Sequence, residues 1–260
     1  MSRARQHRFM LTAGVLAAVV AAVAAALLWG ARAGTERGQA DAVADFRDRA
    51  PAATTATPIG RSPGPEPGVY TYAQRGRESG GVGPVSLARS LPGRARLIVA
   101  PEGSGWSEEL VLAEQHIEAV HLRLREGAIV ETWRRSDVTF LGIGRDDRRE
   151  VSPPALRLPA RPEPGDTWTS RHSTGTIAMV LRGEVLRREP VSVAGRAVPA
   201  LVVRTVTTSS GTHPGTRTDT IWWSPAHRLP LRWDIDTRVR GIARLDTATS
   251  LRLTDLRPRV

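Results

Sequence analysis

The pattern of apolar and polar positions changes twice along the chain. From Phe9 to Gly30 every residue except Thr12 is apolar or glycine, and Arg3, Arg5 and Arg8 precede this run. At about 1.5 Å rise per residue, such a run reaches across the roughly 30 Å hydrocarbon core of a bilayer. The apolar core of a cleavable signal peptide has only about 7 to 15 residues. We therefore predict a transmembrane signal-anchor helix over residues 9–30, preceded by a basic cytoplasmic tail at residues 1–8.

The charges that flank this run predict its orientation. The arginines of the tail are not balanced by acidic residues, whereas Arg32, Glu36 and Arg37 nearly cancel one another. Because an excess of arginine marks the cytoplasmic side, we expect the N-terminus inside and the main domain outside. The bilayer is then the first partner of the chain. The alternative is secretion after signal cleavage near Ala33, since residues 31–33 have the A-x-A spelling of a cleavage site.

Beyond the apolar run, the pattern changes first to a linker and then to strands. Residues 31–67 form a juxtamembrane segment and a linker rich in Pro, Ala and Thr, which cannot bury enough apolar surface to fold. From about Val69 the period becomes two, as in half-buried antiparallel strands. The clearest run, residues 229–236, places on one face Leu229, Leu231, Trp233 and Ile235.

These alternating runs predict the fold class. Turn residues separate the runs, and no long apolar stretch of period 3.6 follows residue 68, so a parallel βαβ architecture is not expected. We predict that residues 68–260 form an extracytoplasmic, mainly β domain. Its expected architecture is one antiparallel sheet, curved or rolled into a half-barrel-like form.

Composition narrows the chemistry and the partners. The chain has no Cys, which excludes disulfides, thiol nucleophiles and thiolate metal sites. All 37 basic residues are Arg, and the domain after residue 67 carries a net charge of +8 out of the chain's +11. That charge favours an anionic wall polymer or lipid headgroup as a neighbour. Nucleic acid is not expected, because only 5% of residues are aromatic and stacking platforms need aromatics.

No motif in the chain predicts catalysis. Residues 60–64 (Gly-Arg-Ser-Pro-Gly) spell a nucleophile elbow, but they lie in the linker without the required strand and helix. Asp234 and Asp236 share a strand face about 7 Å apart, a separation used by inverting glycosidases. Because Arg232 and Arg238 share that face, a solvated ion ladder is the better interpretation. We predict no catalytic residues.

The histidines and glycines likewise predict no metal or cofactor site. His116 and His121 are five residues apart, which places them on opposite faces of a strand. His172, His213 and His227 fall near predicted strand ends, where we expect solvent exposure. The Gly142-x-Gly144 segment lacks the spacing of a phosphate or calcium loop. We therefore expect no metal and no cofactor.

Several short motifs together suggest a family. They are Gly68-Val-Tyr-Thr-Tyr, Leu156-Arg-Leu-Pro with Pro164-Gly-Asp-Thr-Trp168, Val191-Ser-Val-Ala-Gly195, and Trp223-Ser-Pro with Leu229-Pro-Leu-Arg232. In this order they resemble a family of bacterial envelope β-domains whose fold is similar to the periplasmic lipoprotein-carrier half-barrel. The resemblance implies a curved antiparallel sheet closed on its concave side by short helices. The chain departs from it in lacking a lipobox cysteine and an obvious closing helix.

Location and expected shape lead to a function hypothesis. We expect a non-enzymatic, membrane-anchored domain that binds an apolar or amphipathic envelope ligand, such as a lipid or glycolipid, on its concave face. Trp233, Leu231 and Met179 are the expected pocket residues, because such ligands bind in concave apolar pockets. The alternative is a scaffolding domain that contacts another envelope protein, and a third hypothesis is an envelope-polymer hydrolase.

Overall fold

The computed structural model describes residues 64–83, 85–140, 143–211, 213–241 and 243–260. The predicted tail, transmembrane helix and nearly all of the linker lie outside these residues. The described residues form strands and turns without a helix, and therefore include no helix long and apolar enough to cross a membrane. In chain order the strands are β1 (Gly68–Val82), β2 (Val85–Ser90), β3 (Arg94–Glu102), β4 (Gly105–Ala113), β5 (His116–Arg125), β6 (Ala128–Phe140), β7 (Ile143–Leu158), β8 (Thr167–Thr174), β9 (Ile177–Val193), β10 (Arg196–Ser210), β11 (Gly215–Ser224), β12 (Leu229–Val239) and β13 (Ala243–Leu253).

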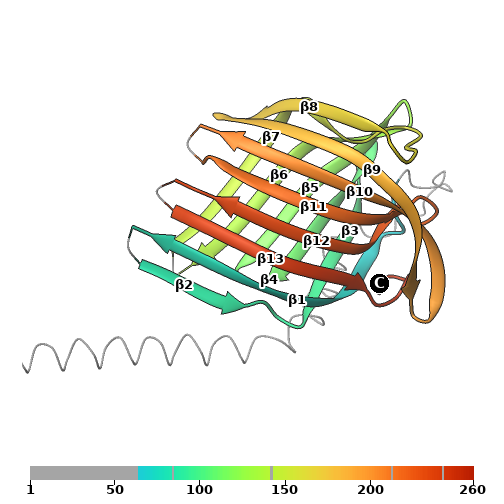
Figure 1. Cartoon of the computed structure of the whole chain (residues 1–260), viewed down its shortest axis with the longest axis horizontal. Helices are drawn as coiled ribbons and strands as arrows, with labels where there is room; N and C mark the ends of the chain where they lie inside the picture. Colours follow the sequence, from blue (N-terminus) through green and yellow to red (C-terminus); the bar gives the residue numbers. More distant parts are fainter. Residues whose placement is uncertain (1–63, 84, 141–142, 212, 242) are drawn as a thin grey trace, which may run out of the picture. The chain divides into compact units, whose positions relative to one another are not determined.

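These strands form one antiparallel sheet that closes on itself as a barrel (Figure 1). Closure comes from β13, which pairs with β1 over eleven residue pairs, from Tyr72–Leu253 to Val82–Ala243. Strands β2 and β3 pair with the same edge of β1 in one register and act as a single interrupted strand. The barrel therefore has twelve strand positions.

The mainly β, antiparallel class predicted from the sequence is confirmed, but the half-barrel form is wrong. An open half-barrel leaves the backbone groups of its first and last strands unpaired, whereas closure pairs them. Here β1 is long enough to pair with β13 on one edge and with β2 and β3 on the other. The short closing helices implied by the family resemblance are absent from the described residues.

Strand β12 shows why this sequence forms the barrel wall. Its inward residues Leu229, Leu231, Trp233 and Ile235 are 0–8% exposed. The outward side chains pair as the predicted ion ladder, with Arg232 to Asp234 at 2.6 Å and Arg238 to Asp236 at 3.2 Å. Alternation therefore places apolar groups in the lumen and paired charges in solvent.

One end of the barrel, where β1 begins and β13 ends, is packed with large side chains. We call it the closed end. Trp106 is fully buried there, and a Cβ built on Gly64 would lie 2.6 Å from the indole ring, so only glycine permits this approach. Tyr70 is also buried, and its hydroxyl donates to the Glu66 carbonyl at 2.7 Å. Val69 and Arg259 exchange two backbone hydrogen bonds, which hold the C-terminal tail across this end.

The barrel wall is weakest between β7 and β8. These strands share two residue pairs, compared with fifteen between β9 and β10. Pro153 and Pro154 lack the N–H groups that a ladder needs. Side chains from β8 replace the missing bonds: the Leu156 N–H donates to Ser170 Oγ at 3.0 Å, and the Trp168 indole donates to the Leu156 carbonyl at 3.3 Å.

Candidate functional site

The other half of the lumen contains a cavity of about 500 Å³. It extends toward the barrel end formed by the β1–β2, β6–β7, β10–β11 and β12–β13 turns, which we call the mouth. Its apolar lining residues are Val85, Leu97, Leu110, Val120, Leu122, Val138, Met179, Trp233, Val239 and Leu245. Its charged and titratable lining residues include Arg134, Arg157, Arg217, Arg244, His116, His213, Glu108, Glu118 and Asp219.

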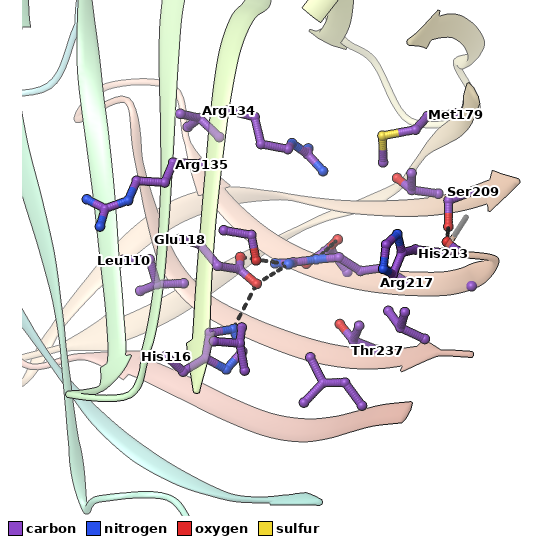
Figure 2. A pocket seen from close by; sticks show the side chains of 18 of the residues that line it. Leu110, His116, Glu118, Arg134, Arg135, Met179, Ser209, His213, Arg217 and Thr237 are labelled. Atoms are coloured by element: carbon purple, nitrogen blue, oxygen red, sulfur yellow. Dashed lines mark hydrogen bonds and ion pairs between the residues drawn. The ribbon is translucent and has the colours of Figure 1, made fainter. Parts of the chain in front are cut away.

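An ion pair crosses the lumen within this chamber. Arg217 on β11 donates two hydrogen bonds of 2.6 Å to the carboxylate of Glu118 on β5, as Figure 2 shows. These strands are six positions apart in the twelve-strand barrel, on opposite walls. Arg217 also donates to Asp219 at 2.9 Å, and Asp219 accepts from the Trp233 indole at 2.8 Å. One guanidinium thus joins two walls of the barrel.

His116 extends this network toward β1. Its ring is 3% exposed, with Nδ1 against Glu78 and Nε2 at 3.2 Å from Glu118. Burial disfavours a charged imidazole, but hydrogen bonds to Glu118 and Glu78 and their charges outweigh it and raise the pKa of His116 to about 9. His116 is therefore a cation at neutral pH. Glu78 also accepts from Arg89 at 2.6 Å and from Thr247 at 2.9 Å.

A second charged group, which we call the deep cluster, comprises Glu131, Arg134, Arg157, Glu108 and His172. Arg134 Nε donates to the fully buried Glu131 at 2.8 Å, and Arg157 lies 3.4 Å from the same carboxylate. Burial would raise the pKa of Glu131, but the two guanidinium groups lower it. Burial raises the pKa of Glu108, whose carboxylate accepts a hydrogen bond from the Trp106 indole at 2.8 Å.

His172 is the unusual member of the deep cluster. It points into the lumen from β8, opposite Met179 of β9, and is 6% exposed. Neither ring nitrogen has a hydrogen-bond partner among the described residues. Burial and the nearby charges of Arg134 and Arg157 lower the pKa of His172 to about 4, so the ring is neutral at neutral pH.

The pocket residues expected from the sequence separate in the structure. Trp233 and Met179 line the cavity, whereas Leu231 is fully buried in the hydrophobic core and does not line it. Leu231 lies two residues from Trp233 on the same face of β12, but on the side of the closed end. Position along the strand therefore decides which inward residue reaches the chamber.

Some of the histidine predictions are confirmed and one is wrong. His116 is buried in the lumen, and His121 stacks on Trp133 with ring centroids 4.3 Å apart, so the two lie on opposite faces as predicted. The exposed position predicted for His227 is confirmed. His172 was predicted to be exposed near a strand end, which is wrong: strand β8 continues past it and turns it inward.

Sequence reasoning missed the charged residues of the lumen. Glu118 and His116 are in phase with Val120 and Leu122 along β5, and this shared parity was the available signal. Burying a charge is costly, so a charged side chain in phase with apolar ones does not by itself indicate a buried site. The described residues contain no group of three or more His, Asp or Glu that could hold a metal ion.

Comparison with known proteins does not assign this chain to a family. No family model matches the chain, and a search of curated proteins found no match.

Proposed function

We propose that this protein binds one amphipathic ligand inside its barrel, without catalysing a reaction on it. The observation that carries the proposal is the cavity of about 500 Å³ in which apolar wall residues and inward arginines share one chamber. This volume lies within the range of about 300–1,000 Å³ that is typical of small-molecule sites. It fits a single-chain amphiphile.

The composition of the chamber supports an amphiphile over a purely apolar ligand. Inward arginines with 19–24% of their side chains exposed face the cavity from β6, β7 and β11. Guanidinium groups in a purely apolar cavity lose hydration without a new partner, which costs free energy. A ligand with both an apolar chain and a polar group satisfies both kinds of wall.

The proposed setting is the cell envelope. The predicted membrane span at residues 9–30 lies outside the described residues, and the predicted position of the domain outside the cytoplasm depends on that span, so both remain predictions. The chain enters the barrel at the closed end, where β1 begins. In this proposal the mouth therefore opens at the opposite end from the linker, and receives a lipid or glycolipid there.

Native mass spectrometry of the full chain, released from its host envelope in lipid nanodiscs, tests the proposal. A retained mass of lipid or glycolipid size is expected. Thr237→Trp, which points into the cavity from β12, should lose that mass. Thr218→Trp, on the outward face of β11 between the inward residues Arg217 and Asp219, should retain it. A bare mass for the wild-type chain contradicts ligand binding.

A scaffolding function is the second candidate, because the surface of β2 suits a protein partner. Val85, which also lines the cavity at the mouth, and Leu87 on the same face of β2 are 57% and 37% exposed, and among the described residues β2 pairs only with β1. An unpaired strand edge with apolar side chains accepts a strand from another chain. A bare mass together with photo-crosslinking from position 87 to an envelope protein would favour this function.

A further inference from the structure

The ion pairs inside the lumen are unevenly distributed. This observation bears on which amphiphile the cavity takes, and the inference drawn from it rests on the proposed ligand-binding function. Around the cross-lumen ion pair, the cations Arg89, His116 and Arg217 face the carboxylates of Glu78, Glu118 and Asp219. Three positive groups therefore meet three negative groups, and this part of the lumen is neutral.

The deep cluster has fewer ion pairs for each guanidinium group. Arg134 and Arg157 share Glu131, which is the only carboxylate within ion-pair distance of either among the described residues. Glu108 also lines the cavity, and burial raises the pKa of its carboxyl group. The two guanidinium groups therefore share one ion-paired carboxylate next to the cavity, in surroundings where water screens their charges poorly.

His172 provides the second, independent observation. A buried polar group without a hydrogen bond is costly, and native proteins rarely keep one unless a ligand or water completes it. A neutral imidazole still offers one N–H donor. His172 lies within electrostatic reach of both Arg134 and Arg157, which line the cavity, so its N–H is a further donor beside them.

Apolar residues continue from this region to the mouth. Val120 is opposite Arg134 in the β5–β6 pairing, and Val138 lies four residues nearer the mouth on β6. Val239 and Leu245 line the same chamber from β12 and β13 near their connecting turn. An acyl chain extending from the deep cluster toward the mouth would therefore contact apolar side chains along its length.

We propose that the ligand is a single-chain anionic amphiphile bound head first. Its carboxylate or phosphate group lies between Arg134 and Arg157 and accepts a hydrogen bond from His172, and its apolar chain points toward the mouth. Guanidinium groups bind carboxylates and phosphates through charge-assisted hydrogen bonds, which are stronger than neutral ones. The head-group chemistry is shared by fatty acids and by alkyl phosphates.

Calorimetric titration of the full chain in nanodiscs, with empty nanodiscs as reference, tests this proposal. The probes are decanoate, decyl phosphate and decanol, which share one chain length. At least one acid should bind about tenfold or more tightly than decanol, the size expected for a charge-assisted contact. The tighter acid identifies the carboxylate or the phosphate as the head group.

Two variants and one matched control locate the head group. Arg157→Met and His172→Phe should each reduce binding of the preferred acid about tenfold and change decanol binding less than twofold. Arg171→Met removes an arginine from the exposed face of β8 next to His172 and should change neither. Since the ring nitrogens of His172 make no hydrogen bond in the described structure, His172→Phe decides the result if Arg157→Met does not fold.

The outcomes separate the two proposals. Equal binding of decanol and both acids, or equal effects of the Arg157 and Arg171 variants, overturns the head-first anion while ligand binding stands. Failure of all three probes to bind overturns both.

Discussion

The two halves of the barrel lumen share one strand geometry but contain opposite chemistry. At the closed end, inward positions carry large apolar or aromatic side chains such as Trp106, Tyr70 and Leu231, each at most 1% exposed. In the mouth half, inward positions of the same sheet carry Glu118, Arg134 and Arg217 around a cavity. The closed end therefore has the dense packing that stabilises a fold, and the mouth half departs from it.

Strand β5 shows the change within one element. Its inward residues near the mouth are His116 and Glu118, and those farther along are Val120 and Leu122. Replacing buried ion pairs by well-packed apolar residues is often neutral or stabilising. Stability alone therefore does not explain the charged layer, and the two halves differ in chemistry as well as in packing.

We expect the largest loss of stability from a substitution in the packed closed end. Trp106→Ala removes a fully buried indole at the closed end and should lower the free energy of unfolding by about 3–5 kcal/mol. Trp133→Ala, which removes a partly exposed ring stacked on His121, should cost about 1 kcal/mol. Urea unfolding of both variants measures the difference, and equal costs would contradict a packed closed end.

Breaking the ion pair across the mouth half should lower the free energy of unfolding somewhat less. Glu118→Gln leaves the buried Arg217 with a weaker partner and should cost about 2–3 kcal/mol, since both side chains are about a fifth exposed to the cavity. The double variant Glu118→Leu/Arg217→Met should recover part of this loss. A coupling energy near zero in the double-mutant cycle would show that the pair does not join the walls.

The pH dependence of stability sharpens the comparison further, because the buried imidazole of His116 lies in the mouth half. The pKa of this histidine is raised from 6.5 to about 9, so protons bind more tightly in the folded state. Its contribution to stability is fully present below about pH 6.5 and is lost as the pH rises through about 9. Urea midpoints between pH 6 and pH 10 should therefore fall, and less steeply in His116→Gln. An unchanged slope in the variant would argue against a buried imidazolium.

We expect the smallest change in stability from a substitution on the outer surface of the barrel. Asp236 and Arg238 are 51% and 68% exposed, so Asp236→Asn should change the free energy of unfolding by about 0.5 kcal/mol or less. This variant serves as the reference for the lumen variants. If Asp236→Asn lowered the free energy of unfolding as much as Glu118→Gln does, the decrease would depend on the loss of a charge and not on its burial in the lumen.

Much of the wall was predictable because strand periodicity is a local property. The alternation over residues 229–236 predicted β12, its buried face and its outward ion ladder, and all three are found. The same reasoning failed for His172 and for Leu231. Both errors came from position along the barrel axis, which a period of two does not specify.

The amino-acid sequence by itself determined an antiparallel, mainly β domain, since alternation and turn residues act over a few neighbours. Only the tertiary structure decided the rest. Closure depends on β1 and β13, about 170 residues apart in the chain and paired from Tyr72 to Val82. The Glu118–Arg217 bond joins strands on opposite walls. Such contacts depend on how the whole sheet curves, and that curvature brings charged side chains from distant strands together inside the lumen.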